Sequence, residues 1–243
     1  LLSYEIKSEK WTEYPYPSTL RGGPGGNSLA VAPNGMIFSS GAGQVKMLNP
    51  TTKEWKEWDS PSWKSYPGGY GLTVAGDGTI YMAEEYANKM LHVDPVTGNV
   101  EELKIPIKEE AFPRRMGADT DGNVWVGLWR AGKLMKIDVK TKEMTIIDPP
   151  TPRNGAYSVS VDKTHNLVWV SLHRADLIAS YNPKTKVWTE YPLPQAESDV
   201  RRIEVDQHNP NHIWYSSAGG TTAGTTGGEF NGGARMGYIE LLP

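Results

Sequence analysis

Short apolar runs recur along the chain at a nearly constant interval, and each run closes with a large residue. The closing residues, Phe38, Tyr81, Trp125, Trp169 and Trp214, stand 43, 44, 44 and 45 residues apart. A second phrase begins at residues 11, 55, 100, 144 and 188, so its steps are 44, 45, 44 and 44. Two independent landmarks with one period indicate that a single structural unit has been repeated.

The copy at residues 68–106 shows what this unit is. Its apolar segments predict four strands, at residues 72–74, 79–83, 89–93 and 100–105. The Gly- and Asp-containing segments 76–78 and 94–98 are predicted turns, because these residues tolerate the backbone conformations that tight turns need. Pro106 ends the last strand, since proline cannot donate to a strand ladder. Short strands repeated at this period predict an all-β fold, a β-propeller of four-stranded blades.

The repeat also predicts the organisation of the chain, which we expect to be one propeller domain spanning residues 1–243. Its expected parts are a partial blade at 1–17, full blades at 22–61, 66–106, 112–150 and 154–194, and a final partial blade at 198–243. The first part supplies third and fourth strands and the last part supplies the first three. We therefore expect a piece of a longer ring of six or seven blades; the alternative is a six-bladed ring closed imperfectly by these ends. The Gly/Thr-rich segment 219–234 is either a tolerated surface loop or a lid.

Composition narrows the function classes. The net charge of −3 indicates no broad basic face for nucleic acid. The absence of cysteine excludes disulfides, thiolate metal sites and cysteine nucleophiles. No apolar run reaches the roughly 18 residues that a membrane span needs. No signal peptide is visible, and because the chain begins with Leu1 we expect a mature or trimmed piece.

Three phrases of the repeat resemble those of the streptogramin (virginiamycin B) lyase family. They are Trp188-Thr189-Glu190-Tyr191-Pro192-Leu193-Pro194, Asp121-Gly122-Asn123-Val124-Trp125 and Asn88-Lys89-Met90-Leu91. The resemblance implies a seven-bladed bacterial propeller, secreted or periplasmic and sometimes fused to other domains. It also implies a carbon–oxygen lyase that opens a cyclic depsipeptide ester by elimination, using Mg²⁺ and a histidine base. In such a reaction the base removes the proton α to a carbonyl while the metal stabilises the enolate-like charge.

The positions that carry this chemistry in the family are only partly matched. The family's histidine falls at the head of the inner strand, where this chain has Asn27, Tyr70, Arg114, Tyr157 and Arg201. The family's glutamate falls on Gly41, Glu84, Leu128, Leu172 and Ser217. For a lyase, the resemblance therefore implies Glu84 as the metal ligand, with His173 as base and Glu85 as a second catalytic candidate. The alternative for the two glutamates is that they lie in a solvated loop or pair with Arg130 or Arg115. The alternative for His173 is a hydrogen-bonded structural role.

The inner-strand heads of a propeller point toward its central channel, so these positions also suggest a binding site. The ligand-binding candidates are Asn27, Tyr70, Arg114, Arg115, Trp129, Arg130, Tyr157, Arg174, Arg201 and Arg202. Repeated guanidinium groups suit a carboxylate-bearing ligand, because arginine offers a bidentate fork. The alternative is that each arginine bonds backbone carbonyls or acidic residues of adjacent blades. Most tryptophans hold repeat positions and are expected in blade cores, whereas Trp63 and Trp129 break the pattern.

Three functions remain open at this point. The first is a module that binds a small anionic ligand or a protein partner at the channel mouth. The second is the metal-dependent lyase, which would require Mg²⁺. The third is a structural scaffold in a larger assembly. We expect neither a nucleic-acid partner nor a membrane span.

Overall fold

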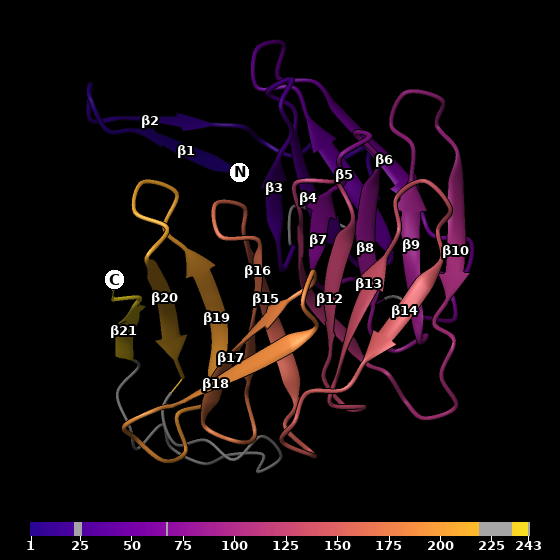
Figure 1. Cartoon of the computed structure of the whole chain (residues 1–243). Helices are drawn as coiled ribbons and strands as arrows, with labels where there is room; N and C mark the ends of the chain where they lie inside the picture. Colours follow the sequence, from indigo (N-terminus) through magenta and orange to yellow (C-terminus); the bar gives the residue numbers. More distant parts are fainter. Residues whose placement is uncertain (22–25, 67, 219–234, 243) are drawn as a thin grey trace. The chain divides into compact units, whose positions relative to one another are not determined.

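A computed structural model of the chain describes residues 1–21, 26–66, 68–218 and 235–242, and the expected Gly/Thr-rich loop at 219–234 lies outside these ranges (Figure 1). The described residues form 21 β-strands and no helix. They therefore include no helix long and apolar enough to cross a membrane. The chain divides into two units: unit 1 is Leu1–Val74 with Gly78–Leu103, and unit 2 is Ala75–Asp77 with Lys104–Pro243.

Unit 1 contains a two-stranded sheet and two four-stranded sheets, all antiparallel. The hairpin is β1 (Leu2–Glu5) and β2 (Lys10–Glu13). The first four-stranded sheet is β3 (Leu29–Val31), β4 (Ile37–Gly41), β5 (Gln44–Leu48) and β6 (Trp55–Asp59). The second is β7 (Leu72–Val74), β8 (Ile80–Glu84), β9 (Lys89–Val93) and β10 (Val100–Lys104). The strands of this second sheet lie within one residue of those that the sequence predicts.

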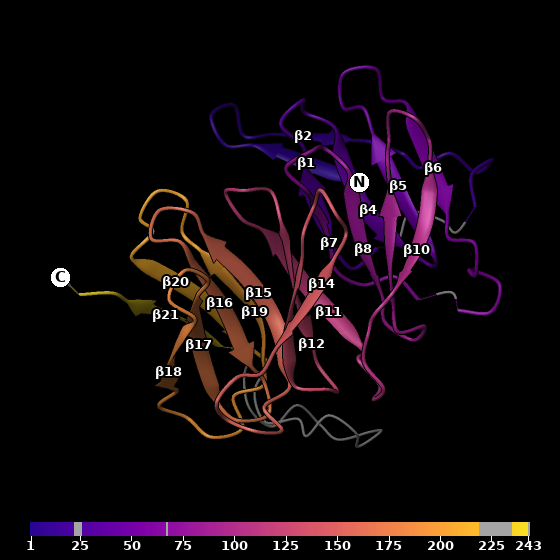
Figure 2. The ribbon, with the colours of Figure 1, turned by 45° about the vertical axis from the view of Figure 1, so that its right-hand side comes forward.

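Unit 2 repeats the same meander. Its four-stranded sheets are β11 (Pro113–Ala118), β12 (Val124–Leu128), β13 (Lys133–Ile137) and β14 (Met144–Ile147), then β15 (Ala156–Asp162), β16 (Leu167–Leu172), β17 (Leu177–Asn182) and β18 (Val187–Pro192). A three-stranded sheet follows, of β19 (Val200–Val205), β20 (His212–Ser217) and β21 (Arg235–Glu240). Among these strands, β15 contacts both β11 and β19 (Figure 2).

Each unit buries its own apolar core between neighbouring sheets. In unit 1 the core includes Phe38, Val45, Leu72, Ile80 and Met82. In unit 2 one core forms around Trp125 and a second around Trp169. The second strands β8, β12 and β16 are buried almost throughout, whereas the fourth strands are largely half-exposed. A sheet buried on both faces needs a near-continuous apolar strand, which explains the apolar runs that mark the repeat.

The turn between third and fourth strands shows why the repeat is so regular. In the sheet β7–β10 the Asp94 carboxylate accepts hydrogen bonds from the backbone N–H groups of Val96, at 2.9 Å, and Thr97, at 3.2 Å. Asn182 makes the same two bonds, to Lys184 and Thr185, in the sheet β15–β18. The turn then closes through a residue with positive φ, which is Gly98 in one copy and Lys186 in the other. Side-chain bonds of this kind replace ladder bonds where the chain reverses.

Candidate functional site

The heads of the inner strands in unit 2 are shaped by β-bulges. The register between β11 and β12 shifts between Pro113 and Met116, and that between β15 and β16 shifts between Ala156 and Val159. A third shift, between Val200 and Arg202, interrupts the pairing of β19 with β20. A bulge leaves an extra residue unpaired and redirects its side chain. The bulged residues include Arg114, Tyr157 and Arg201, so local backbone geometry presents three of the predicted binding residues.

Around the first two bulges lies a group that we call the arginine–aromatic cluster, made of Phe112, Arg114, Trp129, Tyr157 and Arg174. The Arg114 guanidinium carbon lies 4.4 Å from the Phe112 ring centroid and 5.2 Å from the centroids of Trp129 and Tyr157. The Arg174 guanidinium carbon lies 4.3 Å from the Trp129 centroid. At these distances a cation is attracted by the negative face of an aromatic ring. The Arg130 guanidinium carbon also lies 4.6 Å from the Phe112 centroid, so three guanidinium groups lie on rings of this cluster.

His173 lies against this cluster and is fixed by three neighbours. Its ring stacks on Tyr157, with centroids 5.1 Å apart and planes 13° from parallel. Its Nδ1 accepts a hydrogen bond from Trp129 Nε1 at 3.4 Å, and its Nε2 pairs with the Asp199 carboxylate. Because Nδ1 accepts, the ring proton lies on Nε2 and points to Asp199. Both ring nitrogens are engaged, and the histidine holds Trp129 and Tyr157 in place.

Asp199 is the acidic partner in this arrangement. It is buried and accepts hydrogen bonds from Arg201 Nε at 3.0 Å and from an Arg201 terminal nitrogen at 2.7 Å. Burial raises the pKa of Asp199, but the hydrogen bonds from His173 and Arg201 outweigh it and lower the pKa to about 2. Asp199 therefore stays ionised at neutral pH.

Most of the other predicted arginines are occupied by protein groups. Arg130 pairs with Glu110, and Arg202 pairs with Glu204 at 2.8 Å. Arg115 Nε donates to the Arg201 carbonyl oxygen at 3.2 Å. Arg174 differs, because it is exposed and has no ion pair with any residue that the structure describes. Its charge is held on Trp129 without being neutralised there.

The predicted residues of unit 1 lie among different contacts. Asn27 donates through its side-chain nitrogen to the Gly69 carbonyl oxygen at 3.4 Å, and the backbone N–H of Tyr70 bonds the Ala83 carbonyl oxygen at 3.0 Å. Trp63, the other tryptophan outside the repeat, carries the Arg21 guanidinium 3.7 Å from its ring centroid. Asn27 and Tyr70 lie in unit 1, whereas Arg114, Tyr157 and Arg201 lie in unit 2.

The two predicted glutamates are buried, so the alternative of a solvated loop is wrong. Glu84 is only 1% exposed, and neither of its carboxylate oxygens has hydrogen-bonding geometry with a described residue. Burial is the largest influence and raises the pKa of Glu84 to about 7; the Ser60 hydroxyl and Lys89 lower it, and Glu102 raises it. The polar groups near Glu84 bond to Glu102 instead. Glu102 pairs with Lys89 and accepts a hydrogen bond from the Ser60 hydroxyl at 2.8 Å.

This environment does not fit the magnesium ion that the resemblance implies. Mg²⁺ is bound by ionised carboxylates and water in a near-octahedral shell, whereas Glu84 ends a buried strand and its pKa is raised to about 7, which disfavours the ionised form. Within the described ranges, no three His, Cys, Asp or Glu side chains gather closely enough to hold a metal ion. Glu84 and Glu85 belong to unit 1, and His173 belongs to unit 2.

Sequence reasoning missed two residues of the site, Phe112 and Asp199. Both have positive φ values, 52° and 46°, which are uncommon for residues other than glycine. Both stand immediately before an inner strand. Phe112 contacts Trp129, which follows β12, and Asp199 contacts His173, which follows β16. Their only sequence signal is this position before a bulged strand, which does not reveal the partner.

Comparisons with known proteins agree with the fold. A solved streptogramin B lyase superposes with a TM-score of 0.69 at 18% identity, over 88% of this chain and 69% of the other. Virginiamycin B lyase from Staphylococcus aureus gives 0.71 at 15% identity, over 90% of this chain and 71% of the other. The extracellular domain of a hybrid two component system from B. thetaiotaomicron gives 0.62 at 18% identity, over 79% of this chain and 27% of the other.

At these identities the solved structures show the fold alone, and they confirm the predicted all-β β-propeller of four-stranded blades. No curated protein sequence matches the chain. The family model described as the virginiamycin B lyase family matches residues 10–231, which is most of the sequence. The chain belongs to the virginiamycin B lyase family.

Proposed function

We propose that this member of the family is a binding module whose arginine–aromatic cluster takes a planar anionic ligand. The observation that carries the proposal is the Arg174 guanidinium, exposed and lying 4.3 Å from the Trp129 ring centroid. A guanidinium held on an aromatic face keeps its full positive charge and its outward hydrogen-bond donors. A ligand with an aromatic ring and a carboxylate would stack on this surface and pair with that charge.

The surroundings support a site that is formed before the ligand arrives. Trp129 donates to His173, and His173 is held in turn by Asp199 and by the Tyr157 ring. Rings fixed in this way lose little conformational freedom on binding, which favours affinity. Arg114 adds a second guanidinium beside Trp129.

The test is a titration of the full chain with naphthalene-2-carboxylate, in which binding is measured from the change in tryptophan fluorescence. Arg174→Gln should weaken binding at least about tenfold, because it removes a charged hydrogen-bond donor. The chain supplies a matched control in Arg130, which follows β12 as Arg174 follows β16. Arg130 also lies on a ring of the cluster, 4.6 Å from the Phe112 centroid, but its charge is paired with Glu110. Arg130→Gln should change the dissociation constant less than about twofold.

The neutral analogue naphthalene-2-carboxamide separates charge recognition from stacking. We expect it to bind at least about tenfold more weakly than the carboxylate. Equal binding of the two compounds, or no saturable binding of either, would refute the proposal. A titratable complex with a protein that is abolished by Arg174→Gln, in the absence of naphthoate binding, would instead assign the cluster to a protein partner.

The lyase reaction is tested alongside. A catalytically inactive virginiamycin B lyase from Staphylococcus aureus has been solved with quinupristin. We expect quinupristin to remain intact when incubated with this chain and Mg²⁺, because no described carboxylates gather into a metal site and His173 is bonded at both nitrogens. Ring-opened product from the wild-type chain, lost in His173→Ala, would overturn this assignment. An extracellular or periplasmic location is part of the same proposal, supported by the extracellular domain among the solved structures.

A further inference from the structure

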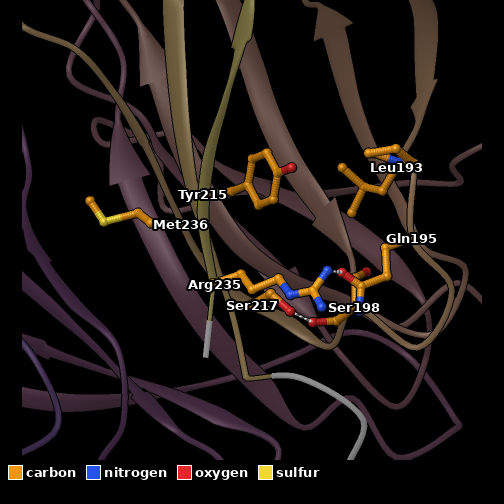
Figure 3. A pocket seen from close by; sticks show the side chains of 8 residues that line it. Leu193, Gln195, Ser198, Tyr215, Ser217, Arg235 and Met236 are labelled. Atoms are coloured by element: carbon orange, nitrogen blue, oxygen red, sulfur yellow. Dashed lines mark hydrogen bonds between the residues drawn. The ribbon is translucent and has the colours of Figure 1, made fainter. Parts of the chain in front are cut away.

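A second location in unit 2, separate from the arginine–aromatic cluster, has the form of a small-molecule site. A cavity of about 240 Å³ opens between the loop that joins β18 to β19 and the ends of β20 and β21 (Figure 3). Leu193, Gln195, Ser198, Tyr215, Ser217 and Arg235 line it. None of these residues belongs to the cluster, and none is explained by the proposed function.

The loop wall of this cavity is held rigidly. The Asp176 carboxylate accepts hydrogen bonds from the backbone N–H groups of Glu197, at 2.9 Å, and Ser198, at 2.8 Å, and from the Ser198 hydroxyl at 2.7 Å. The Ser217 hydroxyl donates to the Ser198 carbonyl oxygen and so ties the loop to β20. A carboxylate with three donors on one loop fixes that loop's conformation. The cavity is therefore formed in advance of any ligand.

The charge in this cavity comes from Arg235, the first residue of β21. Its guanidinium donates to the side-chain oxygen of Gln195, which orients the arginine across the cavity (Figure 3). Because Gln195 is neutral, this bond positions the charge without cancelling it. Among the residues that the structure describes, no acidic side chain lines the cavity and none forms an ion pair with Arg235. The site is suited to a single negative charge.

The apolar part of the cavity is formed by Leu193, Pro194 and the Tyr215 ring, whereas the Met236 side chain extends away from the group (Figure 3). Tyr215 packs over Gly237 of β21, where an added Cβ would lie 2.6 Å from the tyrosine Cζ and hydroxyl oxygen. Gly237 thus lets the ring lie flat along β21. The hydroxyl of Tyr215 has no hydrogen-bond partner among the described residues, and it points toward Leu193 in Figure 3.

We propose that this cavity binds a small organic monocarboxylate, with its carboxylate on Arg235 and its apolar portion between Leu193 and Tyr215. The volume matches a ligand with one ring or a short alkyl chain, since a water molecule occupies about 30 Å³ in the liquid. Arg235 supplies a fork for the carboxylate, and the Gln195 amide nitrogen and the Tyr215 hydroxyl supply further donors.

The experiment is a benzoate titration of the full chain, in which binding is measured from the NMR chemical shifts of backbone amides around the cavity. Arg235→Gln should raise the dissociation constant about ten- to a hundredfold, as expected for the loss of a charged hydrogen-bond partner. Arg153→Gln, which removes an exposed arginine of the same unit, should leave it unchanged. Benzamide should bind at least about tenfold more weakly than benzoate.

A second variant tests the apolar wall without altering the charge. Gly237→Ala forces the Tyr215 ring to move, because the new methyl group would overlap it. Benzoate should then bind several-fold more weakly, while acetate, which lacks a ring, should bind as it does to the wild type. Circular dichroism of both variants checks that the sheet is intact.

Three results would overturn the proposal: no saturable binding of benzoate to the wild type, equal affinity of the wild type and folded Arg235→Gln, or equal affinity for benzoate and benzamide. Benzoate binding that is lost in Arg174→Gln but retained in Arg235→Gln would assign the ligand to the arginine–aromatic cluster and also refute this site. Failure here leaves naphthoate binding at the cluster unaffected, so the two proposals are separable.

Discussion

The ends of two second strands, β8 and β16, occupy the same position of the repeat but have different chemistry. β8 ends at Glu84, a buried carboxyl group with no hydrogen-bond partner among the described residues, and Glu85 follows. β16 ends at Leu172, which packs in the apolar core, and His173 and Arg174 follow. His173 forms an ion pair with the Asp199 carboxylate, whereas Glu84 lies in an apolar strand and has a raised pKa.

The difference teaches that the repeat fixes where a side chain lies but not what it can do. At the first position both residues are buried, so leucine suits it and glutamate is costly. At the following positions the function depends on a partner from another part of the chain. After β16, Asp199 pairs with His173, and the Arg174 guanidinium lies on the Trp129 ring.

The largest expected effect comes from breaking the bonded side of this comparison. Asp199→Ala leaves the buried His173 without its carboxylate and removes the ion pair of the half-exposed Arg201. This change should destabilise the chain by about 3–5 kcal/mol. Urea unfolding measures this change. The matched control is Glu204→Ala, which removes the exposed partner of Arg202 and should cost less than about 1 kcal/mol. Equal losses in the two variants would show that burial of the Asp199 pair is not what matters.

Replacing Glu84 should increase the free energy of unfolding, which is the opposite of the effect expected for Asp199→Ala. Glu84→Leu introduces the residue that the repeat has at Leu128 and Leu172, and should stabilise the chain at pH 8 by about 2–3 kcal/mol. The gain should shrink as the pH falls toward 5. Glu84 binds its proton more tightly in the folded state, where its pKa is about 7 against an ordinary 4.5, so its ionisation costs stability as the pH rises through this range.

Urea midpoints of the wild type and Glu84→Leu at pH 5, 6, 7 and 8 follow this dependence. Glu84→Gln is the control for shape, since it cannot ionise and should remove the pH dependence that Glu84 causes. A stability difference that is constant from pH 5 to pH 8 would mean that Glu84 does not titrate in this window.

The smallest expected change in stability comes from the turns between the third and fourth strands of the same two sheets. Gly98 has φ of 78° after β9, whereas Lys186 has φ of 60° at the equivalent turn after β17. Because a side chain is strained in this region, Lys186→Gly should stabilise the chain by up to about 1 kcal/mol. Gly98→Lys should destabilise it by a similar amount. If thermal unfolding shows both changes to be neutral, the turns do not carry this strain.

The sequence predicts the parts of the structure that depend on local pattern. The apolar runs and the Gly- and Asp-containing turns place β7 to β10 within one residue of their observed bounds. The period also identifies equivalent positions, such as those of Arg130 and Arg174. These features follow from strand alternation and turn chemistry, which act over a few residues.

Partners could not be predicted, because they come from distant parts of the chain. Both Arg130 and Arg174 lie on an aromatic ring, and nothing near them in sequence shows that only Arg130 pairs with a carboxylate, that of Glu110, among the described residues. Glu84 and Glu85 suggest a solvated loop by their charge, yet the strand that ends at Glu84 is buried throughout. The cavity at Arg235 needs a loop, two strand ends and the fold of unit 2 to bring them together.

The most direct test of the account is the naphthalene-2-carboxylate affinity of three proteins, the wild type, Arg174→Gln and Arg130→Gln. If equivalent arginines differ because only one is neutralised by a carboxylate, Arg174→Gln should lose at least about tenfold and Arg130→Gln less than about twofold. Equal losses, or a larger loss in Arg130→Gln, would contradict the claim that partners, rather than repeat position, decide which side chains can bind.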